Sequence, residues 1–282
     1  MFELGRRTLD KVDVDRCHND GQPRRVAFGT THKGQPKRNS SGKYVGSFSL
    51  PFAQTIRRIF EDDTGLELFQ SKQGPGVWRS IKTEAEFVAI QAWVQRQGTR
   101  IFLKDCLNLS VSLDQNFVDN QSGTHTTLGD LEARAKSSRD QDAIGAIVDR
   151  YCQAIGDLPG YRDARHIAAV PSRPGKSYDL PTELAAQIAG RLNLVDLTPT
   201  FAFSGVKAAT KTLDVDQKWK SWEKSGLRFD GALENAPPVI LIDDKYQSGI
   251  SIQFVASRLY VAGAGEVFGL CAVKTLRDSD NV

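Results

Sequence analysis

The stretch VILIDDKYQSGIS, residues 239–251, brings an apolar segment directly up to two adjacent acids. The segment from Val239 to Ile242 has the length and composition of a buried strand in a parallel sheet. Asp243 and Asp244 follow it at once, so the strand would carry both carboxylates to an edge of the sheet. We therefore expect the chemistry of this protein at Asp243 and Asp244.

Small polar residues and a glycine separate the acids from a predicted helix. The helix would bury one apolar face, formed by Ile252, Val255, Ala256 and Leu259. A tight turn that enters a helix presents free backbone N–H groups and the positive end of the helix dipole, and such a turn suits a phosphate group. The candidate phosphate-binding residues, which we call the 247–251 loop, are Gln247, Ser248, Gly249, Ile250 and Ser251.

The whole stretch resembles the signature that binds phosphoribosyl diphosphate (PRPP) in type I phosphoribosyltransferases. As in that family, an aliphatic strand, two acids, a short spacer and small polar residues around a glycine follow one another. The resemblance implies that Asp243 and Asp244 act in catalysis by holding the ribose hydroxyls and a hydrated Mg²⁺, and that the 247–251 loop holds the 5′-phosphate. Lys245 and Gln247 depart from the pattern, because the family usually has an aliphatic and a small residue there.

Other classes of protein share parts of this pattern. An ordinary Rossmann-like strand can end in two aspartates without the function that the resemblance implies. A P-loop nucleotide-binding protein is disfavoured, because the chain has no GxxxxGK[ST] motif. Covalent catalysis by a side chain is not indicated either, since the sequence offers no convincing Ser/His/Asp or Cys/His pattern.

The segment HIAAVP, residues 166–171, predicts a second strand that ends in a polar, glycine-containing loop. A helix would begin after this loop, near Pro181. By resemblance, the loop after such a strand contacts the pyrophosphate of PRPP. The residues in that position are Ser172, Arg173, Gly175 and Lys176. The arginine and the lysine would supply the cations that a pyrophosphate group needs.

The segment from Phe201 to Asn235 is rich in lysine and contains Trp219 and Trp222. In the family, a mobile loop or hairpin in this region closes over the reaction, which makes Lys207 and Lys211 candidate loop residues by resemblance. The segment is most similar to the ComF-like branch, which is associated with DNA uptake, but the zinc-binding cysteines of the ComF N-terminus are missing. The tryptophans would either pack a helix or stack on nucleic-acid bases, and helix packing is the preferred interpretation.

Composition bounds the class of protein. With 282 residues and 40% apolar residues, the chain can bury one large core or two modest ones. The cysteines lie far apart without a CxxC pair, which disfavours a zinc site and a disulfide framework; they are Cys17, Cys106, Cys152 and Cys271. No apolar run approaches the roughly 20 residues that span a bilayer. We expect a cytoplasmic protein without a membrane span.

We expect two unequal parts in the chain: an α+β cap over residues 1–138 and a phosphoribosyltransferase-like α/β core over residues 139–282, in which helices flank a parallel sheet. The predicted last strand, residues 266–273, leaves no room for a C-terminal hood, so the cap would select the acceptor. Within the cap the sequence predicts a long-looped hairpin of two strands, then two helices and a third strand. These elements lie at residues 24–29, 44–50, 51–65, 83–98 and 99–105.

The leading hypothesis is a Mg²⁺-dependent phosphoribosyltransferase of nucleotide metabolism. It would transfer the phosphoribosyl group of PRPP, or of a related ribose phosphate, to an acceptor that the sequence does not identify. The alternative is a noncatalytic nucleic-acid-binding or regulatory protein that retains the fold and its phosphate pocket. Charge favours this alternative, because the first 60 residues hold twelve lysines and arginines and five acids. In either case two copies of the chain could form a homodimer.

Overall fold

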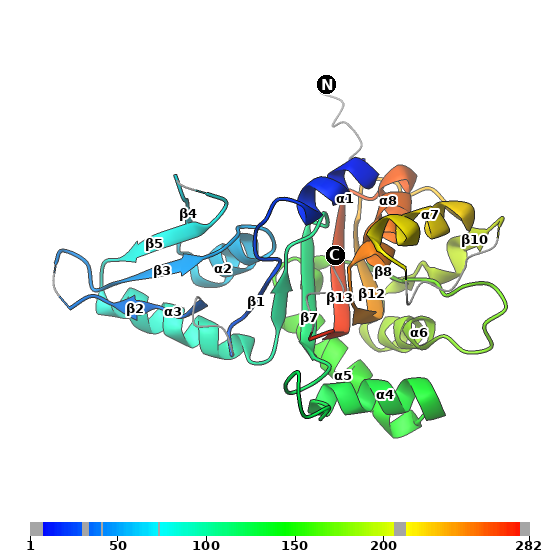
Figure 1. Ribbon diagram of the computed structural model, residues 1–282, viewed down its shortest axis with the longest axis horizontal. Coiled ribbons are helices and arrows are strands. Elements are labelled where there is room, and N and C mark those ends of the chain that lie inside the picture. Colours follow the sequence, from blue (N-terminus) through cyan, green and yellow to red (C-terminus); the bar gives the residue numbers. More distant parts are fainter. Residues whose placement is uncertain (1–7, 30–33, 41, 73, 206–212, 277–282) are drawn as a thin grey trace.

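Seven strands form one large, mostly parallel sheet in the computed structural model, which describes residues 8–29, 34–40, 42–72, 74–205 and 213–276. In spatial order they are β1 (Arg25–Ala27), β6 (Ile101–Leu103), β7 (Leu109–Gln115), β13 (Glu266–Lys274), β12 (Pro238–Tyr246), β8 (His166–Ala169) and β9 (Val195–Asp196). The strands from β7 to β9 run parallel, whereas β6 and β1 are antiparallel additions. Helices flank this sheet (Figure 1). The predicted α/β class, with helices flanking a mostly parallel sheet, is confirmed.

Strand β12 lies within the parallel part of the sheet, between β13 and β8. It pairs with β8 in parallel over residues 239–242, so the loops that follow the two strands leave the same edge of the sheet, as predicted. The sequence predicted that this strand would end at the acids. Instead β12 continues to Tyr246, because its pairing with β13 extends through Asp243 and Lys245.

Helices cover both faces of the sheet. The helices on one face are α4 (Thr127–Ser138), α5 (Gln141–Asp157) and α6 (Leu180–Leu192), and those on the other are α1 (Lys11–His18), α7 (Val215–Lys224) and α8 (Ile250–Ala262). In β12, Ile240 and Ile242 belong to the first core, whereas Val239 and Leu241 belong to the second. This two-sided cover explains why the strand is a continuous apolar run.

A second, antiparallel sheet lies in the N-terminal half of the chain. Its strands, in spatial order, are β2 (Lys37–Arg38), β3 (Gly46–Leu50), β5 (Val77–Ile81) and β4 (Phe69–Gln70). The helices that complete its core are α2 (Ile56–Thr64) and α3 (Glu84–Gln97). We call these strands and helices the α+β unit. Figure 1 shows the unit projecting to the left of the large sheet, beyond β1.

Aromatic contacts join the α+β unit to the large sheet. The Trp93 ring of α3 lies 4.9 Å from the ring of Phe28 and 6.1 Å from that of Phe102, measured between centroids. Phe102 belongs to β6, which pairs with β1. The predicted hairpin of residues 24–29 with residues 44–50 is therefore wrong, because β3 pairs with β2 and β5 instead.

The large sheet draws strands from both halves of the chain. β1, β6 and β7 all precede residue 138, yet they extend the sheet that contains β12 and β13. α4 also precedes this residue and contacts β13 and β7. The expected boundary at residue 138 is corrected accordingly. The α+β unit stands beside the β1 edge, at the opposite end of the sheet from β8 and β9.

The lysine- and tryptophan-rich segment forms two antiparallel strands that are connected by a helix. β10 (Phe201–Phe203) pairs with β11 (Leu227–Phe229), and α7 lies between them along the chain. Trp219 and Trp222 are buried, and their rings lie 5.0 and 5.5 Å from the ring of Phe254 in α8. The helix-packing interpretation is confirmed, and these tryptophans are not available to nucleic-acid bases.

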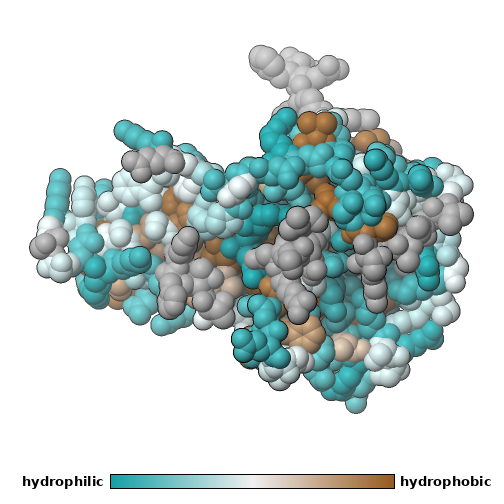
Figure 2. Space-filling view, viewed as in Figure 1, coloured by the Kyte–Doolittle hydropathy of each residue, from teal (hydrophilic) through white to brown (hydrophobic). Residues whose placement is uncertain are grey.

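None of the helices in the described part of the chain combines the length and the apolar character that a bilayer span requires. The face of the molecule seen in Figure 2 is mostly hydrophilic. Apolar side chains appear on it in scattered small areas, several of them around α1 and α8 at the top of the view.

Candidate functional site

The 247–251 loop joins β12 to α8 and leaves its backbone N–H groups free. In the part of the chain that the structure describes, none of these five N–H groups donates an intramolecular hydrogen bond. Gly249 adopts the left-handed conformation, with φ of 78°, and so turns the chain into the helix. A small pocket of about 80 Å³ opens at the loop, and Asp243 and Lys218 help to line it. The loop therefore offers backbone donors to an anion.

Two elements distant in sequence support the loop. Trp222 of α7 donates a hydrogen bond from Nε1 to the hydroxyl of Ser251, at 3.2 Å. Arg24, which lies just before β1, donates from Nη2 to the carbonyl of Ser248, at 3.3 Å. Both contacts hold the loop through groups other than its N–H donors. Lys218, one turn before Trp222, adds a positive charge to the pocket.

Asp243 lies at the pocket, and its surroundings disfavour its negative charge. Its Oδ1 accepts a hydrogen bond from the backbone N–H of Asp244, at 2.9 Å. Burial and the neighbouring Asp244 raise the pKa of Asp243 well above its usual value. Tyr151 of α5 donates to the carbonyl of Asp243 at 2.7 Å and so fixes the backbone here. A ligand that brings a cation or hydroxyl donors would relieve this unfavourable charge.

Asp244 is buried and paired with a lysine of α4. Nζ of Lys136 lies 2.6 Å from Oδ2 of Asp244 and 3.3 Å from Oε1 of Glu132. Burial opposes the charge of Lys136, but Asp244 and Glu132 raise its pKa above the usual value, so it is protonated. Nζ of Lys245 lies 2.9 Å from Oε2 of Glu132. Lys245, which departs from the family pattern, is thus the second cation, beside Lys136, that balances the charge of the buried Glu132.

The loop after β8 leaves the sheet at the same edge as the 247–251 loop. Its candidate residues are Ser172, which is half-buried, and Arg173, Gly175 and Lys176, which are exposed. Gly175 has a positive φ of 80° at a turn closed by the Lys176 N–H and the Arg173 carbonyl, 3.4 Å apart. Nζ of Lys176 lies 3.5 Å from Oδ1 of Asp179, the residue before α6. The loop thus carries its cations toward solvent at this edge.

Some residues around the acid pair gave no signal in the sequence. Glu132 and Lys136 have the i,i+4 spacing of an ordinary surface ion pair, which does not reveal that their helix covers an acid pair. The guanidinium carbon of Arg139 lies over the ring of Tyr178, 4.6 Å from the ring centroid. The hydroxyl of Tyr178 is buried and has no hydrogen-bond partner among the described residues. The candidate loop residues Lys207 and Lys211 lie outside the described residues.

His18 connects α1 to the 247–251 loop through Arg24. Its two ring nitrogens lie 3.1 and 2.9 Å from the guanidinium nitrogens of Arg24. Burial, together with the charges of Arg24 and Lys11, lowers the pKa of His18 from 6.5 to about 3. His18 is therefore neutral in the folded protein near neutral pH.

Acidification to about pH 5 should destabilise the protein through His18. The unfolded chain binds a proton as the pH falls below 6.5, whereas the folded chain resists protonation until about pH 3. The stabilising contribution of neutral His18 is complete above pH 6.5 and declines as the pH falls through this window. At about pH 5 the loss is about 2 kcal/mol, because each pKa unit corresponds to about 1.4 kcal/mol. Urea unfolding at about pH 7.5 and about pH 5 measures the difference.

The His18→Gln variant removes this ionisable group while keeping a side chain that can hydrogen-bond to Arg24. Between the same two pH values it should lose about 2 kcal/mol less free energy of unfolding than the wild type. Equal losses in the two proteins would show that His18 does not carry the effect.

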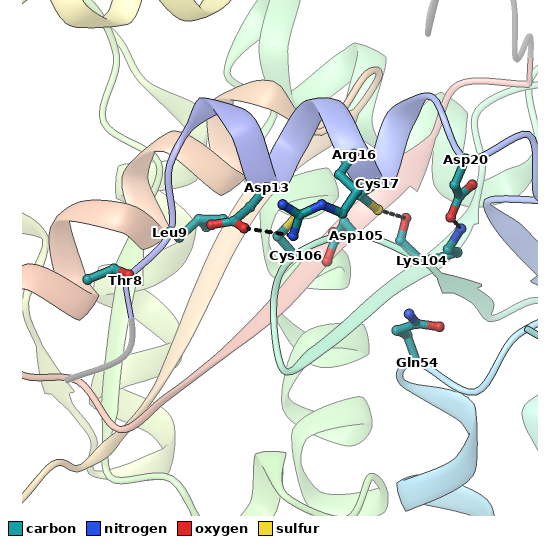
Figure 3. Close-up of a pocket in the computed structure, with 10 residues that line it drawn as sticks. All are labelled: Thr8, Leu9, Asp13, Arg16, Cys17, Asp20, Gln54, Lys104, Asp105 and Cys106. Atoms are coloured by element: carbon teal, nitrogen blue, oxygen red, sulfur yellow. Dashed lines mark hydrogen bonds and ion pairs between the residues drawn. The ribbon is translucent and has the colours of Figure 1, made fainter. Parts of the chain in front are cut away.

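A larger cavity, of about 520 Å³, lies between α1 and the turn that joins β6 to β7 (Figure 3). Its charged side chains include two ion pairs: Asp13 with Arg16, at 3.6 Å, and Asp20 with Lys104. Asp105 connects the cavity to β12, because its Oδ2 accepts a hydrogen bond from the Tyr246 hydroxyl at 3.1 Å. All of its lining residues belong to the N-terminal part that was expected to select an acceptor.

Two of the four cysteines meet at this cavity. The thiol of Cys106 and the sulfur of Cys17 share a hydrogen bond, which lowers the pKa of Cys17 and raises that of Cys106. All four cysteines are free. Sequence spacing did not predict this contact, because it depends on packing α1 against a turn that lies far along the chain.

No family model matches the chain, and no protein in the curated set matches it significantly. Among solved structures, the adenine phosphoribosyltransferase of Trypanosoma brucei, in complex with AMP, pyrophosphate and ribose-5-phosphate, is similar over 52% of this chain and 71% of its own. The two share 15% sequence identity with a TM-score of 0.34, a likeness too weak to support a function by itself.

Proposed function

We propose that the protein binds PRPP or a related ribose phosphate at the edge of the sheet where β12 and β8 end. One observation carries the proposal: the free N–H groups of the 247–251 loop directly follow the strand that bears Asp243 and Asp244. The loop suits a 5′-phosphate, and the carboxylates suit the hydroxyl groups of a ribose. A ligand that joins a phosphate to a sugar diol would use both sets of groups at once.

The proposed reaction transfers the phosphoribosyl group from pyrophosphate to an acceptor. The bond from C1′ to pyrophosphate breaks, a bond from C1′ to the acceptor forms, and positive charge develops on the ribose ring between the two events. Arg173 and Lys176 would stabilise the departing pyrophosphate, while Asp243 and Asp244 would hold the ribose. No side chain of the protein needs to form a covalent bond to the sugar.

The acid pair fits a Mg²⁺ ion that keeps most of its water. Mg²⁺ is commonly bound by one or two carboxylates, with water and substrate phosphates completing its shell. Within the described residues, no cluster of three or more acidic, histidine or cysteine side chains could hold a metal. Because Lys136 already balances Asp244, Asp243 is the carboxylate left to receive the hydrated ion. The ion would neutralise part of the pyrophosphate charge.

Calorimetry with PRPP and Mg²⁺ tests the binding step. We expect saturable binding that requires Mg²⁺ for full affinity, because the pyrophosphate and the acid pair otherwise repel each other. A pyrophosphate-release assay across nucleobases and small amines then tests transfer and identifies the acceptor. Binding without release would favour the regulatory alternative, and no binding of PRPP or of ribose 5-phosphate would reject the proposal.

A further inference from the structure

We propose that the α+β unit binds single-stranded nucleic acid on the open face of its four-stranded sheet. The inference concerns a surface separate from the acid pair and does not depend on the proposed function. The side chains of this outer face are Lys37, Ser47, Ser49, Phe69, Trp78 and Ser80.

The strand pairing arranges these side chains in two rows across the sheet. Directly opposed residues share a face, so one row runs Lys37–Ser47–Ser80 and the next runs Ser49–Trp78–Phe69. Among the residues that alternate with them, Phe48, Leu50, Val77 and Ile81 are buried in the core of the unit. The outer face is thus the side of the sheet opposite the one that packs on the core.

Two large aromatic rings stand on this face. The side chains of Trp78 and Phe69 are 43% and 44% exposed, and their centroids lie 6.1 Å apart with planes inclined by 52°. Folding does not require large rings at these positions, since the core is complete beneath them. Exposed aromatic rings beside hydroxyl side chains are the groups on which unpaired bases stack and to which they hydrogen-bond.

The four strands of this sheet carry basic residues and no acid. From Gly21 to Phe60 the sequence has eight lysines and arginines and no acid, and from Leu68 to Thr83 it has three and no acid. All four strands of the sheet fall within these two segments. The acids of the unit lie between or after the segments, in α2, in α3 and at Glu67.

Two of the arginines are committed to α3. Arg38 pairs with Glu84, and Arg79 lies 2.8 Å from Glu86. The lysines are placed differently: Lys37 stands in the first row of the outer face, and Lys72 lies two residues after the end of β4. Both are exposed. An open sheet face with aromatic rings, hydroxyls and exposed lysines is complementary to a phosphate backbone with accessible bases. A duplex fits less well, because its bases are stacked inside.

Fluorescence anisotropy with a labelled single strand of about 12 nucleotides, within the range bound by small single-strand modules, tests the proposal. The wild type should bind, and a duplex of the same length should bind at least about tenfold more weakly. Trp78→Ala combined with Phe69→Ala should weaken binding of the single strand at least about tenfold, because each stacked base depends on a ring. The melting temperature should change little, since both side chains are exposed.

Matched variants separate stacking from general hydrophobic contact. Trp78→Leu with Phe69→Leu keeps apolar surface but loses the rings and should weaken binding as the alanine pair does. Val261→Ala removes an apolar side chain that is 62% exposed on α8 and should leave binding unchanged. Lys37→Gln should reduce the slope of log K against log salt by about 0.7, the value for one phosphate contact to a single strand.

Three results would overturn the proposal. They are no binding of the single strand at low salt, equal binding of the duplex, and unchanged binding in the Trp78 and Phe69 double variant. A face that serves a protein partner instead would give the first of these results. Because Asp243→Asn with Asp244→Asn should leave strand binding intact, failure here and failure of the PRPP proposal are distinguishable.

Discussion

Replacing both acids, Asp243→Asn with Asp244→Asn, should weaken PRPP binding by about 2–4 kcal/mol, which corresponds to a roughly 30- to 1,000-fold higher Kd. The carboxylates would lose charge-assisted hydrogen bonds to the ribose and their interaction with hydrated Mg²⁺. The free protein should stay folded. Burial and Asp244 raise the pKa of Asp243, so the folded protein already disfavours a charge there, and Lys136 keeps Glu132 as its partner.

A thermal melt with and without PRPP and Mg²⁺ measures this effect. Ligand at about 100 times the wild-type Kd should stabilise the wild type by about 2.7 kcal/mol, and the double variant should gain less than about 1 kcal/mol at the same concentration. Asp62→Asn with Asp63→Asn is the matched control, because it changes two adjacent acids of α2, remote from β12. This control should respond to ligand as the wild type does. Equal stabilisation of the Asp243 and Asp244 variant would show that the acid pair is not the ribose site.

The fold of the sheet was predictable where local sequence and burial agree. The apolar run before Asp243 could only be a strand covered on both sides, and two such strands with helices after them favour parallel pairing. The structure places β8 and β12 side by side in that orientation. The start of α3 was equally predictable: the expected helix begins at residue 83, and in the structure Thr83 accepts a hydrogen bond from the Glu86 N–H at 3.2 Å.

The pairing of the N-terminal strands was not predictable from local pattern. Two short strands with a loop between them look alike whether they form a hairpin or join different sheets. β1 pairs with β6 because this pairing buries Val26 and Phe102, which lie opposite each other, in the main core. Such long-range burial is a property of the assembled fold. The predicted boundary at residue 138 was wrong for the same reason, because the sequences of β6 and β7 do not indicate which sheet these strands join.

The candidate site likewise contains residues that the sequence predicted and residues that it did not. The 247–251 loop and the acids form one continuous stretch, so their juxtaposition followed from a single strand, turn and helix. Lys136 and Glu132 come from α4, and no periodicity in that helix indicates what it covers. Lys245 illustrates the consequence: in the sequence it is only a departure from a family pattern, whereas in the structure it pairs with Glu132.

Gly249→Val should abolish phosphate binding at the 247–251 loop, with an effect comparable to loss of the acid pair. Gly249 has φ of 78°, a conformation that costs a non-glycine residue about 1–2 kcal/mol and a β-branched residue more. A Cβ atom there would also lie 2.2 Å from the hydroxyl oxygen of Tyr246, which is buried and bonded to Asp105. Because the ring cannot move freely, the loop must shift, and its N–H groups would no longer converge. Calorimetry with PRPP and Mg²⁺ measures the loss.

Two control variants test whether Gly249→Val acts by displacing the backbone of the loop. One adds backbone strain elsewhere in the chain, and the other removes a side-chain hydroxyl from the loop. Gly65→Val, at the end of α2, introduces a similar strain at φ of 67° with nothing within 4 Å of the new Cβ, so it should lose stability but keep PRPP binding. Ser251→Ala removes a hydroxyl that accepts a hydrogen bond from Trp222 but leaves the backbone donors in place, so it should weaken binding only modestly. If Ser251→Ala abolished binding while Gly249→Val preserved it, the side chains and not the backbone of this loop would hold the phosphate.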